Sequence, residues 1–160
     1  MNRGTTLGVA AVIVTILGMS PAAASGQAPA AAEASIEEEI LARYSSFEGG
    51  AEEQTWEKWQ DYFLRSPNIA NVHGDRLELG WEAYREGSVA YDQRPVEKRA
   101  AVRFEGLKIR VIDGKTAWVT GDFMNIIGER EMHALFYDML IKTPDGWRVF
   151  FSYVAPPRSG

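Results

Sequence analysis

The chain has 160 residues, which is enough for one domain and too few for two. Its 22 Asp and Glu residues outnumber its 17 Lys and Arg residues, and the formal net charge is -5. Nucleic-acid backbones are bound by clustered basic residues, so this acidic balance argues against a nucleic-acid partner. The sequence contains no Cys, which excludes disulfides, thiolate catalysis and a lipoprotein anchor.

The first 24 residues have the three parts of a secretory signal peptide. Arg3 supplies a positive charge, residues 7–19 are apolar, and small residues lead up to Ala24. The alternative is a transmembrane anchor, but this apolar run spans only roughly 20 Å as a helix, against a bilayer core of about 30 Å. We therefore expect cleavage after Ala24, a periplasmic or secreted location, and no stable membrane insertion of the mature chain. Residues 25–34 are rich in Ala without apolar periodicity, which predicts a flexible leader.

Three helices are expected in the first half of the domain. A capping box at residues 35–38 starts the first helix, and the Gly pair at residues 49–50 ends it. Aromatic residues spaced by three and four predict a second helix over residues 55–64. A third helix is expected over residues 81–91, since Pro95 blocks its continuation. Between the last two helices, the sequence predicts a short hairpin of residues 69–72 and 76–79.

From Val96 onward the apolar residues alternate with a period of two, which is typical of strands. Turn signals at residues 113–114, 128–129 and 144–146 divide this stretch into four strands. The apolar positions change from even to odd at Glu105 and Gly106, which predicts a β-bulge and a bend. Helices followed by a long meander predict an α+β fold over residues 35–157, with three helices packed on a strongly bent antiparallel sheet.

Several local motifs support a resemblance to a known family. They are Leu-Ala-Arg-Tyr at residues 41–44, Gly-Trp-Glu-Ala-Tyr at residues 80–84, and the final strand pair with its Asp-Gly-Trp turn at residues 145–147. Together with the order of the elements, they make residues 35–157 resemble the nuclear-transport-factor-2-like superfamily, particularly its SnoaL-like and ketosteroid-isomerase-like branches. The resemblance implies a cone-shaped domain with a pocket between sheet and helices, and a homodimer that pairs through the sheet. It leaves the function open, because this superfamily carries many activities and binding roles.

Three residues are candidates for catalysis. Asp138 lies on a strand with two largely apolar faces, and burial there would raise its pKa and favour the neutral, hydrogen-bond-donating acid. The resemblance implies that Asp138 and Tyr44 occupy positions that hold an oxyanion in the ketosteroid isomerases. His73 lies near the position of the general-base carboxylate of those enzymes and could act as the base itself. Each residue also has a structural interpretation: Asp138 as an ion-pair partner, Tyr44 as a core residue and His73 as a surface turn residue.

A second group of residues is predicted to line the pocket. Aromatic side chains there would give a flat apolar surface for a planar or steroid-like ligand. The predicted ligand-binding residues are Trp59, Phe63, Trp81, Tyr84, Asp122, Phe136 and Tyr153. No cofactor or metal is expected, because His73, Asp75 and His133 lack metal-ligand spacing and the sequence has no Gly-rich phosphate loop.

Three functions are consistent with these patterns. The first is an exported small-molecule-binding domain with an apolar pocket. The second is a proton-transfer enzyme of isomerase, dehydratase or cyclase type, in which His73 removes a proton while Tyr44 and neutral Asp138 hold the enolate oxygen of a carbonyl substrate. The third is a sheet-mediated dimerisation or interaction module. It would use an apolar stripe formed by Leu135, Tyr137, Met139 and Ile141.

Overall fold

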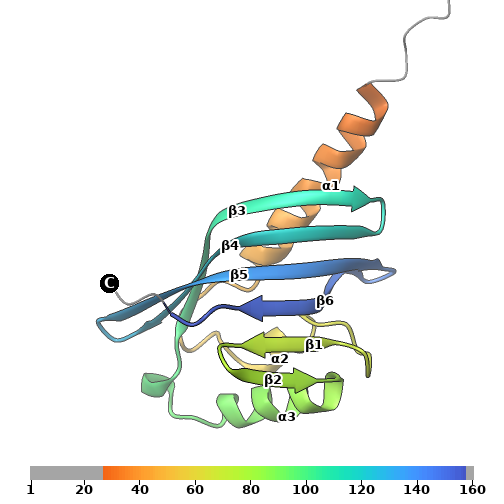
Figure 1. The fold of residues 1–160 in the computed structure, drawn as a ribbon. Helices are drawn as coiled ribbons and strands as arrows, with labels where there is room; N and C mark the ends of the chain where they lie inside the picture. The colour runs from red at the N-terminus through yellow and green to blue at the C-terminus, as the bar shows by residue number, and fades with distance from the viewer. Residues whose placement is uncertain (1–26, 158–160) are drawn as a thin grey trace, which may run out of the picture.

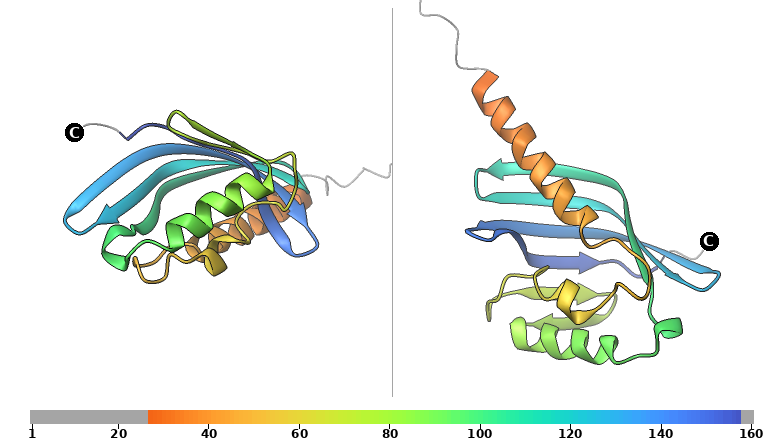
Figure 2. Two further views of the ribbon diagram at one scale, coloured as in Figure 1. Left: turned by 90° about the horizontal axis from the view of Figure 1, so that it is seen from below. Right: turned by 180° about the vertical axis from the view of Figure 1, so that it is seen from behind.

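The computed structural model describes residues 27–157, so the signal peptide predicted over residues 1–24 lies outside the described part of the chain. The helices are α1 (Gln27–Ser45), α2 (Trp56–Trp59), α3 (Trp81–Asp92) and the 3-10 turn η1 (Val96–Lys98). The strands are β1 (Ala70–His73), β2 (Arg76–Leu79), β3 (Ala101–Asp113), β4 (Thr116–Ile127), β5 (Arg130–Thr143) and β6 (Gly146–Val154). Figures 1 and 2 show one sheet with the helices on one of its faces, which leaves the other face without a covering layer.

The six strands form a mixed sheet in the order β2-β1-β6-β5-β4-β3. Strands β3 to β6 form the predicted antiparallel meander, joined by the three predicted turns. Strand β1 pairs in parallel with β6, with Ala70 opposite Phe151 and His73 opposite Val154. The prediction of a purely antiparallel sheet is therefore wrong at this one pairing. Alternation identifies a strand but carries no information about which strand lies beside it.

Two helices differ in length from the predictions. Helix α1 begins at Gln27 and takes the place of most of the flexible leader predicted over residues 25–34, because alanine is the strongest helix former. Helix α2 is a single turn rather than the helix predicted over residues 55–64. The chain after it pairs with the sheet instead: the backbone N–H of Leu64 donates to the carbonyl of Val149 at 2.8 Å. Among the described helices, none combines the length and apolar character needed to cross a membrane.

The β-bulge lies where the change of apolar phase predicts it. The register between β3 and β4 shifts between Glu105 and Lys108, and Gly106 has φ +60°, a left-handed conformation that glycine adopts without strain. This bulge is close to Gly121 of β4, where an added Cβ would lie 2.8 Å from the carbonyl oxygen of Glu105. Both positions therefore depend on glycine, one for its conformation and one for space.

Helix α1 covers one part of the inner face of the sheet. Its buried residue Tyr44 packs edge-on against Phe104 of β3, with ring centroids 5.0 Å apart. The Tyr44 ring also contacts the tilted ring of Phe136 of β5, with centroids 5.7 Å apart. Burial of large side chains such as these contributes about 1.5–3 kcal/mol each. No described residue of α1 lines the cavity that forms beneath α2 and α3. The sheet face is thus divided between a packed core under α1 and a hollow region beside it.

Candidate functional site

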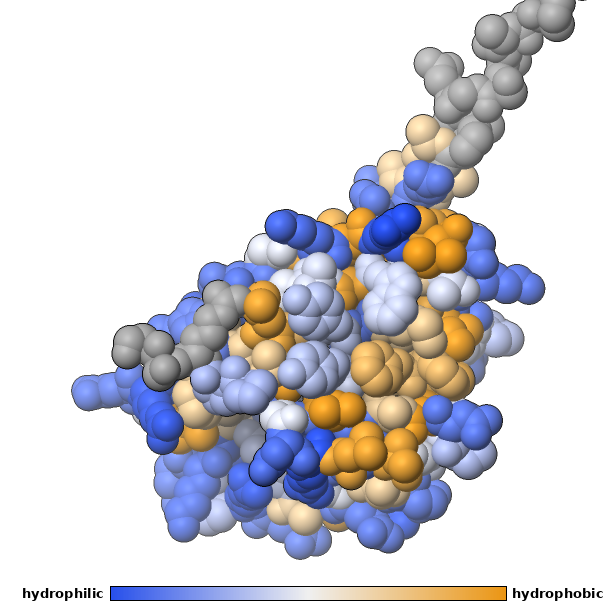
Figure 3. Space-filling view, viewed as in Figure 1, coloured by the Kyte–Doolittle hydropathy of each residue, from blue (hydrophilic) through white to orange (hydrophobic). Residues whose placement is uncertain are grey.

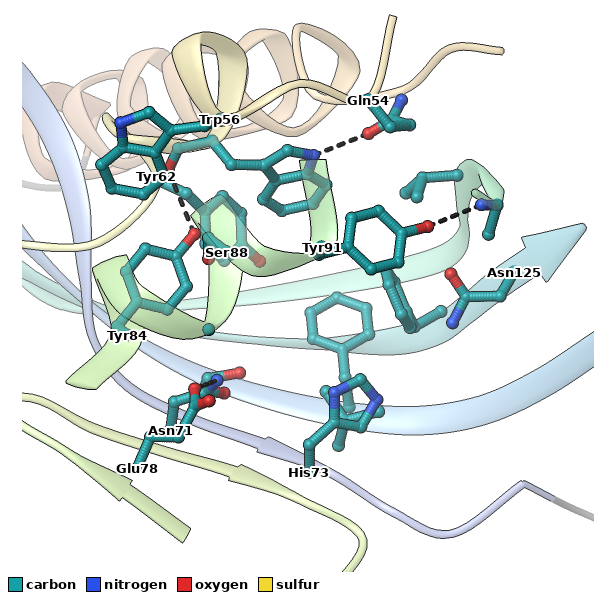
Figure 4. Close-up of a pocket in the computed structure, with 18 of the residues that line it drawn as sticks. Gln54, Trp56, Tyr62, Asn71, His73, Glu78, Tyr84, Ser88, Tyr91 and Asn125 are labelled. Atoms are coloured by element: carbon teal, nitrogen blue, oxygen red, sulfur yellow. Dashed lines mark hydrogen bonds between the residues drawn. The ribbon is translucent and has the colours of Figure 1, made fainter. Parts of the chain in front are cut away.

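A cavity of about 380 Å³ lies between the sheet and the segment that contains α2 and α3. Figure 4 shows many of its lining side chains, which come from α2 and the loops on either side of it, from α3 and the segment after it, and from all six strands. A volume of this order is within the range of sites that hold small organic molecules. Its two walls differ in character, and each follows from the local sequence.

The helical wall is aromatic. Trp56 and Trp59 come from α2, Phe63 from the chain that follows it, and Tyr84 from α3. The rings of Phe63 and Tyr84 have centroids 4.4 Å apart, and the Tyr84 hydroxyl donates to the carbonyl of Trp59 at 3.1 Å. The indole of Trp59 donates to the side-chain oxygen of Gln54 at 2.7 Å. Because these polar atoms are already paired, the wall presents mainly flat apolar surface to the cavity.

The sheet wall carries a row of polar residues. Strand register places Glu78 opposite Asn71, Asn71 opposite Ser152, and Ser152 opposite Asp138. Directly opposite residues point to the same face of a sheet, so this row crosses four neighbouring strands on the inner face. The amide of Asn71 donates to Glu78 Oε2 at 2.8 Å. Glu78, Asn71 and Ser152 line the cavity, whereas Asp138 lies behind the wall.

Asp138 is completely buried and is held by two tyrosines. The hydroxyls of Tyr44 and Tyr62 donate to its Oδ2 at 2.6 and 2.5 Å. Burial raises the pKa of Asp138, against the opposing effect of hydrogen bonds from Ser152, Tyr44 and Tyr62. Burial likewise raises the pKa of Tyr44 and Tyr62 well above the ordinary value for a phenol. Both tyrosines are therefore neutral donors, and Asp138 is a carboxyl group that resists ionisation.

The second carboxyl oxygen of Asp138, Oδ1, has a different environment from Oδ2. Among the described residues, Oδ1 is buried without a hydrogen bond of ordinary geometry, and the neighbouring polar group across the strand pair is the hydroxyl of Ser152. A hydrogen bond from the Ser152 hydroxyl lowers the pKa of Asp138, as the two from the tyrosines do, so burial alone is what raises it. The ion-pair interpretation of Asp138 is not what the structure shows, because its partners are phenols rather than Arg or Lys.

His73 lies at the rim of the cavity. Its side chain is exposed on one side and faces Phe123 on the other, with ring centroids 6.2 Å apart (Figure 4). Burial against the cavity wall lowers the pKa of His73 below its ordinary 6.5. The negative charge of Glu78 partly opposes this decrease in the pKa, and the positive charge of Arg76 adds to it. The imidazole is therefore neutral at neutral pH and available to a molecule in the cavity.

The structure brings together some of the residues predicted from the sequence and separates others. His73, Trp59, Phe63, Tyr84 and Phe136 line the cavity, whereas Tyr44, Asp138 and Trp81 do not. Two more predicted ligand-binding residues, Asp122 and Tyr153, are on the outer face of the sheet, where their register partners are Leu135 and Tyr137. Alternation along a strand defines two faces but not which of them is the inner one, and this is why Asp122 and Tyr153 were assigned to the cavity.

Many residues of the cavity and its hydrogen-bond network are not among the predicted site residues, including Tyr62, Asn71, Glu78 and Ser152. The sequence of β6 alone does not place Ser152 on the inner face: Phe151 and Tyr153 continue the apolar odd positions of Trp147 and Val149, whereas in the structure the buried positions change to even at Ser152 and Val154. This change matches a register shift between Met139 and Leu140 in the paired strand β5. Within residues 27–157, no cluster of three or more His, Asp or Glu side chains could hold a metal ion.

Comparison with known proteins supports the fold. No family model and no curated protein matches the chain. A solved structure of an NTF2-like protein of unknown function from Shewanella oneidensis MR-1 is similar, with a TM-score of 0.67 and 12% identity over 75% of this chain and 98% of that one. The structure of a candidate dehydratase of the NTF2-like family from Streptomyces avermitilis aligns with a TM-score of 0.63 and 15% identity. The alignment covers 77% of this chain and 97% of that one. The structure of an NTF2-like superfamily protein from Salmonella enterica aligns with a TM-score of 0.60 and 18% identity. The alignment covers 82% of this chain and 95% of that one.

These similarities confirm the resemblance stated from the sequence. The chain has the NTF2-like fold, an α+β arrangement with helices on one face of a six-stranded mixed sheet. At such low identities the agreement concerns the fold, and the residues of the cavity must carry any statement about function.

Proposed function

We propose that this chain is an exported domain that binds a small, mainly apolar molecule with a planar body and at least one polar group. The single observation that carries the proposal is a mainly apolar cavity with aromatic surface on its helical wall and a row of polar residues on one part of its sheet wall. The helical wall offers aromatic surface from Trp56, Trp59 and Tyr84, and the sheet wall offers the polar row of Asn71 and Ser152. A planar molecule would stack on the first wall and orient a carbonyl or hydroxyl toward the second.

Binding can be tested with the neutral fluorescent dye N-phenyl naphthylamine. Ser88 of α3 lines the cavity, so Ser88→Phe would fill part of it. Ala90 is exposed on the same helix, so Ala90→Phe adds the same ring without entering the cavity. We expect the wild-type protein and Ala90→Phe to bind the dye equally and Ser88→Phe to lose most binding. Equal binding by all three proteins, or by none, would contradict the proposal.

The proton-transfer alternative finds less support in the geometry. It requires His73, Tyr44 and Asp138 to act on one bound substrate. Of these three, His73 lines the cavity, whereas the Tyr44 hydroxyl is directed to Asp138 at 2.6 Å and both lie behind the wall. A substrate oxygen in the cavity would meet Ser152 and Asn71 first. We therefore favour binding over catalysis.

The export proposal rests on the first 24 residues alone. Its test is the mass of the protein recovered from the envelope fraction of its own host. We expect a chain that begins at Ser25, after cleavage following Ala24. A chain that retains the first 24 residues would contradict cleavage. Native mass spectrometry of the same sample would also report a retained ligand and the number of subunits.

The outer face of the sheet supports a homodimer as the partner proposal. Tyr137 and Trp118 expose 44% and 40% of their surface on this face, although both are large and apolar. Figure 3 views this side of the molecule and shows apolar side chains gathered across the strands. Strand β5 contributes Leu135, Met139 and Ile141 to the same face, all partly buried. A second copy of the chain would cover this surface without involving the cavity.

A further inference from the structure

The charged residues that line the cavity are mostly cations. They are Arg76, Glu78, Arg94 and Lys98. Arg76 forms an ion pair with Glu78 at 2.8 Å, so these two charges compensate each other. Arg94 and Lys98 remain as a pair of positive charges, in a chain whose formal net charge is -5. The cavity thus has a local charge opposite in sign to that of the whole protein.

The two remaining cations have no acidic partner in the described part of the chain. The Lys98 ammonium, in η1, forms no hydrogen bond or ion pair with residues 27–157. The guanidinium of Arg94 lies over the ring of Tyr91, 5.1 Å from its centroid, and its hydrogen-bond donors have no acceptor there. Of the acids nearby in the sequence, Asp92 is already paired with Arg99 at 2.9 Å, and the exposed Glu97, next to Lys98, forms no ion pair with either cation. Both cations are therefore available to an anion that enters from solvent.

A polar amide and an anchored ring complete this end of the cavity. The backbone N–H of Ala100 donates to the Tyr91 hydroxyl at 2.6 Å, which fixes the ring that carries Arg94. Asn125 of β4 also lines the cavity and pairs in register with Val102, two residues after Ala100. An anion near Arg94 and Lys98 could thus also receive a hydrogen bond from an amide. The cavity combines an aromatic wall with a cationic opening.

We propose that the ligand is an amphipathic organic anion, with an aromatic body that stacks in the cavity and a carboxylate or sulfonate held by Arg94 and Lys98. This inference rests on the proposed binding function and adds the chemical class of the ligand. The aromatic wall selects the body of the molecule, and the two cations select its charge. A neutral molecule of the same shape fills the cavity but leaves both cations without a counter-ion.

A matched pair of dyes tests the inference. Anilinonaphthalene sulfonate and N-phenyl naphthylamine share the same aromatic body and differ in the sulfonate. The test variant is Arg94→Gln/Lys98→Gln, and the control is Arg110→Gln/Lys115→Gln, which removes one Arg and one Lys outside the cavity lining. We expect the wild-type protein to prefer the sulfonate and the test variant to lose about tenfold in affinity for it, since exposed ion pairs are individually weak. Binding of the neutral dye should not change, and added salt should reduce the preference.

The outcomes separate this inference from the proposed function. If the neutral dye binds but the sulfonate is not preferred, or if the test variant binds the sulfonate as tightly as the control does, the cationic site is refuted and the cavity proposal stands. If sulfonate binding survives Ser88→Phe, the dye binds outside the cavity and the inference is refuted. If neither dye binds, both proposals fail together.

Discussion

The hydroxyl of Tyr44 in the first helix donates a 2.6 Å hydrogen bond to the carboxyl of Asp138 in β5, 94 residues later in the chain. Tyr62 donates to the same oxygen at 2.5 Å from the segment that follows α2. The three residues connect α1, the aromatic segment and the centre of the sheet. Their arrangement stabilises the wall of the cavity and does not contribute side chains of Tyr44 or Asp138 to its surface.

Replacing Tyr44 by Phe removes one of these hydrogen bonds without changing the shape of the ring. We expect the free energy of unfolding to fall by about 1–2 kcal/mol, because a buried carboxyl group loses a donor. Binding of N-phenyl naphthylamine should be unchanged, since the Tyr44 hydroxyl does not line the cavity. Urea denaturation and dye titration measure the two effects. A normal stability with a loss of dye binding would place Tyr44 in the binding site instead.

Replacing Asp138 by Asn tests the neutral carboxyl group. Burial raises the folded-state pKa of Asp138 above its ordinary 3.8, so the folded state holds this proton more tightly than the unfolded state. The contribution of Asp138 to stability is therefore lost as the pH rises from its ordinary pKa of 3.8 through its higher folded-state pKa, and is constant above that. Asn cannot ionise, so the stability of Asp138→Asn relative to wild type should increase over the same pH range, by up to about 1.4 kcal/mol per pH unit.

The control for this series is Asp145→Asn, which changes an exposed carboxyl group in the turn between β5 and β6. It removes one carboxyl group far from the buried network and provides the baseline for the comparison. Urea midpoints between pH 4 and 8 provide the measurement. A decrease in the relative stability of Asp138→Asn with rising pH would mean that the tyrosine hydrogen bonds outweigh burial, and that Asp138 is ionised in the folded protein.

Gly121 tests the close packing beside the β-bulge. An added Cβ would lie 2.8 Å from the Glu105 carbonyl oxygen and 3.1 Å from Cε1 of Phe136. Backbone cannot yield as a flexible side chain can, so Gly121→Ala should destabilise the domain by about 1–3 kcal/mol. Gly114→Ala is the matched control, because no atom lies within 4 Å of its added Cβ. Thermal or urea unfolding of the two variants should differ clearly; equal stabilities would show that the bulge can adjust.

The outer face of the sheet gives a prediction about the oligomeric state. Tyr137→Glu introduces a charge where a second copy is proposed to pack, so the variant should be monomeric at concentrations where the wild-type protein is a dimer. Leu41→Glu is the control, since Leu41 is 43% exposed but belongs to α1 on the other side of the sheet. Sedimentation velocity distinguishes the species. A wild-type protein that is monomeric throughout would refute the dimer.

The elements that the sequence predicts well are those set by local chemistry. The hairpin turns follow from their Gly residues, and the bulge follows from the change of phase at Glu105 and Gly106. The elements it predicts poorly depend on distant partners. Helix α2 ends early because Phe63 and Leu64 pair with Val149, which lies far away in the sequence.

The same distinction holds for the candidate site. Aromatic richness predicts a wall that includes Trp59 and Tyr84, because these residues must be buried somewhere. The polar row of Glu78, Asn71 and Ser152 exists only through the order of the strands, which no single segment encodes. The direction of the pKa shift at Asp138 agrees with its apolar strand, but its two tyrosine partners come from other elements.

The parallel contact between β1 and β6 has a consequence for how the domain acquires its structure. The short hairpin of β1 and β2 has a sheet neighbour on only one side, and that neighbour is β6, the last strand of the described residues. Isolated two-stranded hairpins are marginal in water, so β1 and β2 depend on β6 for a stable structure. Contacts between segments this far apart in the sequence are slow to form. A variant that lacks β6 would therefore also lose the ordered β1 and β2, and with them the part of the cavity wall formed by Asn71, His73 and Glu78.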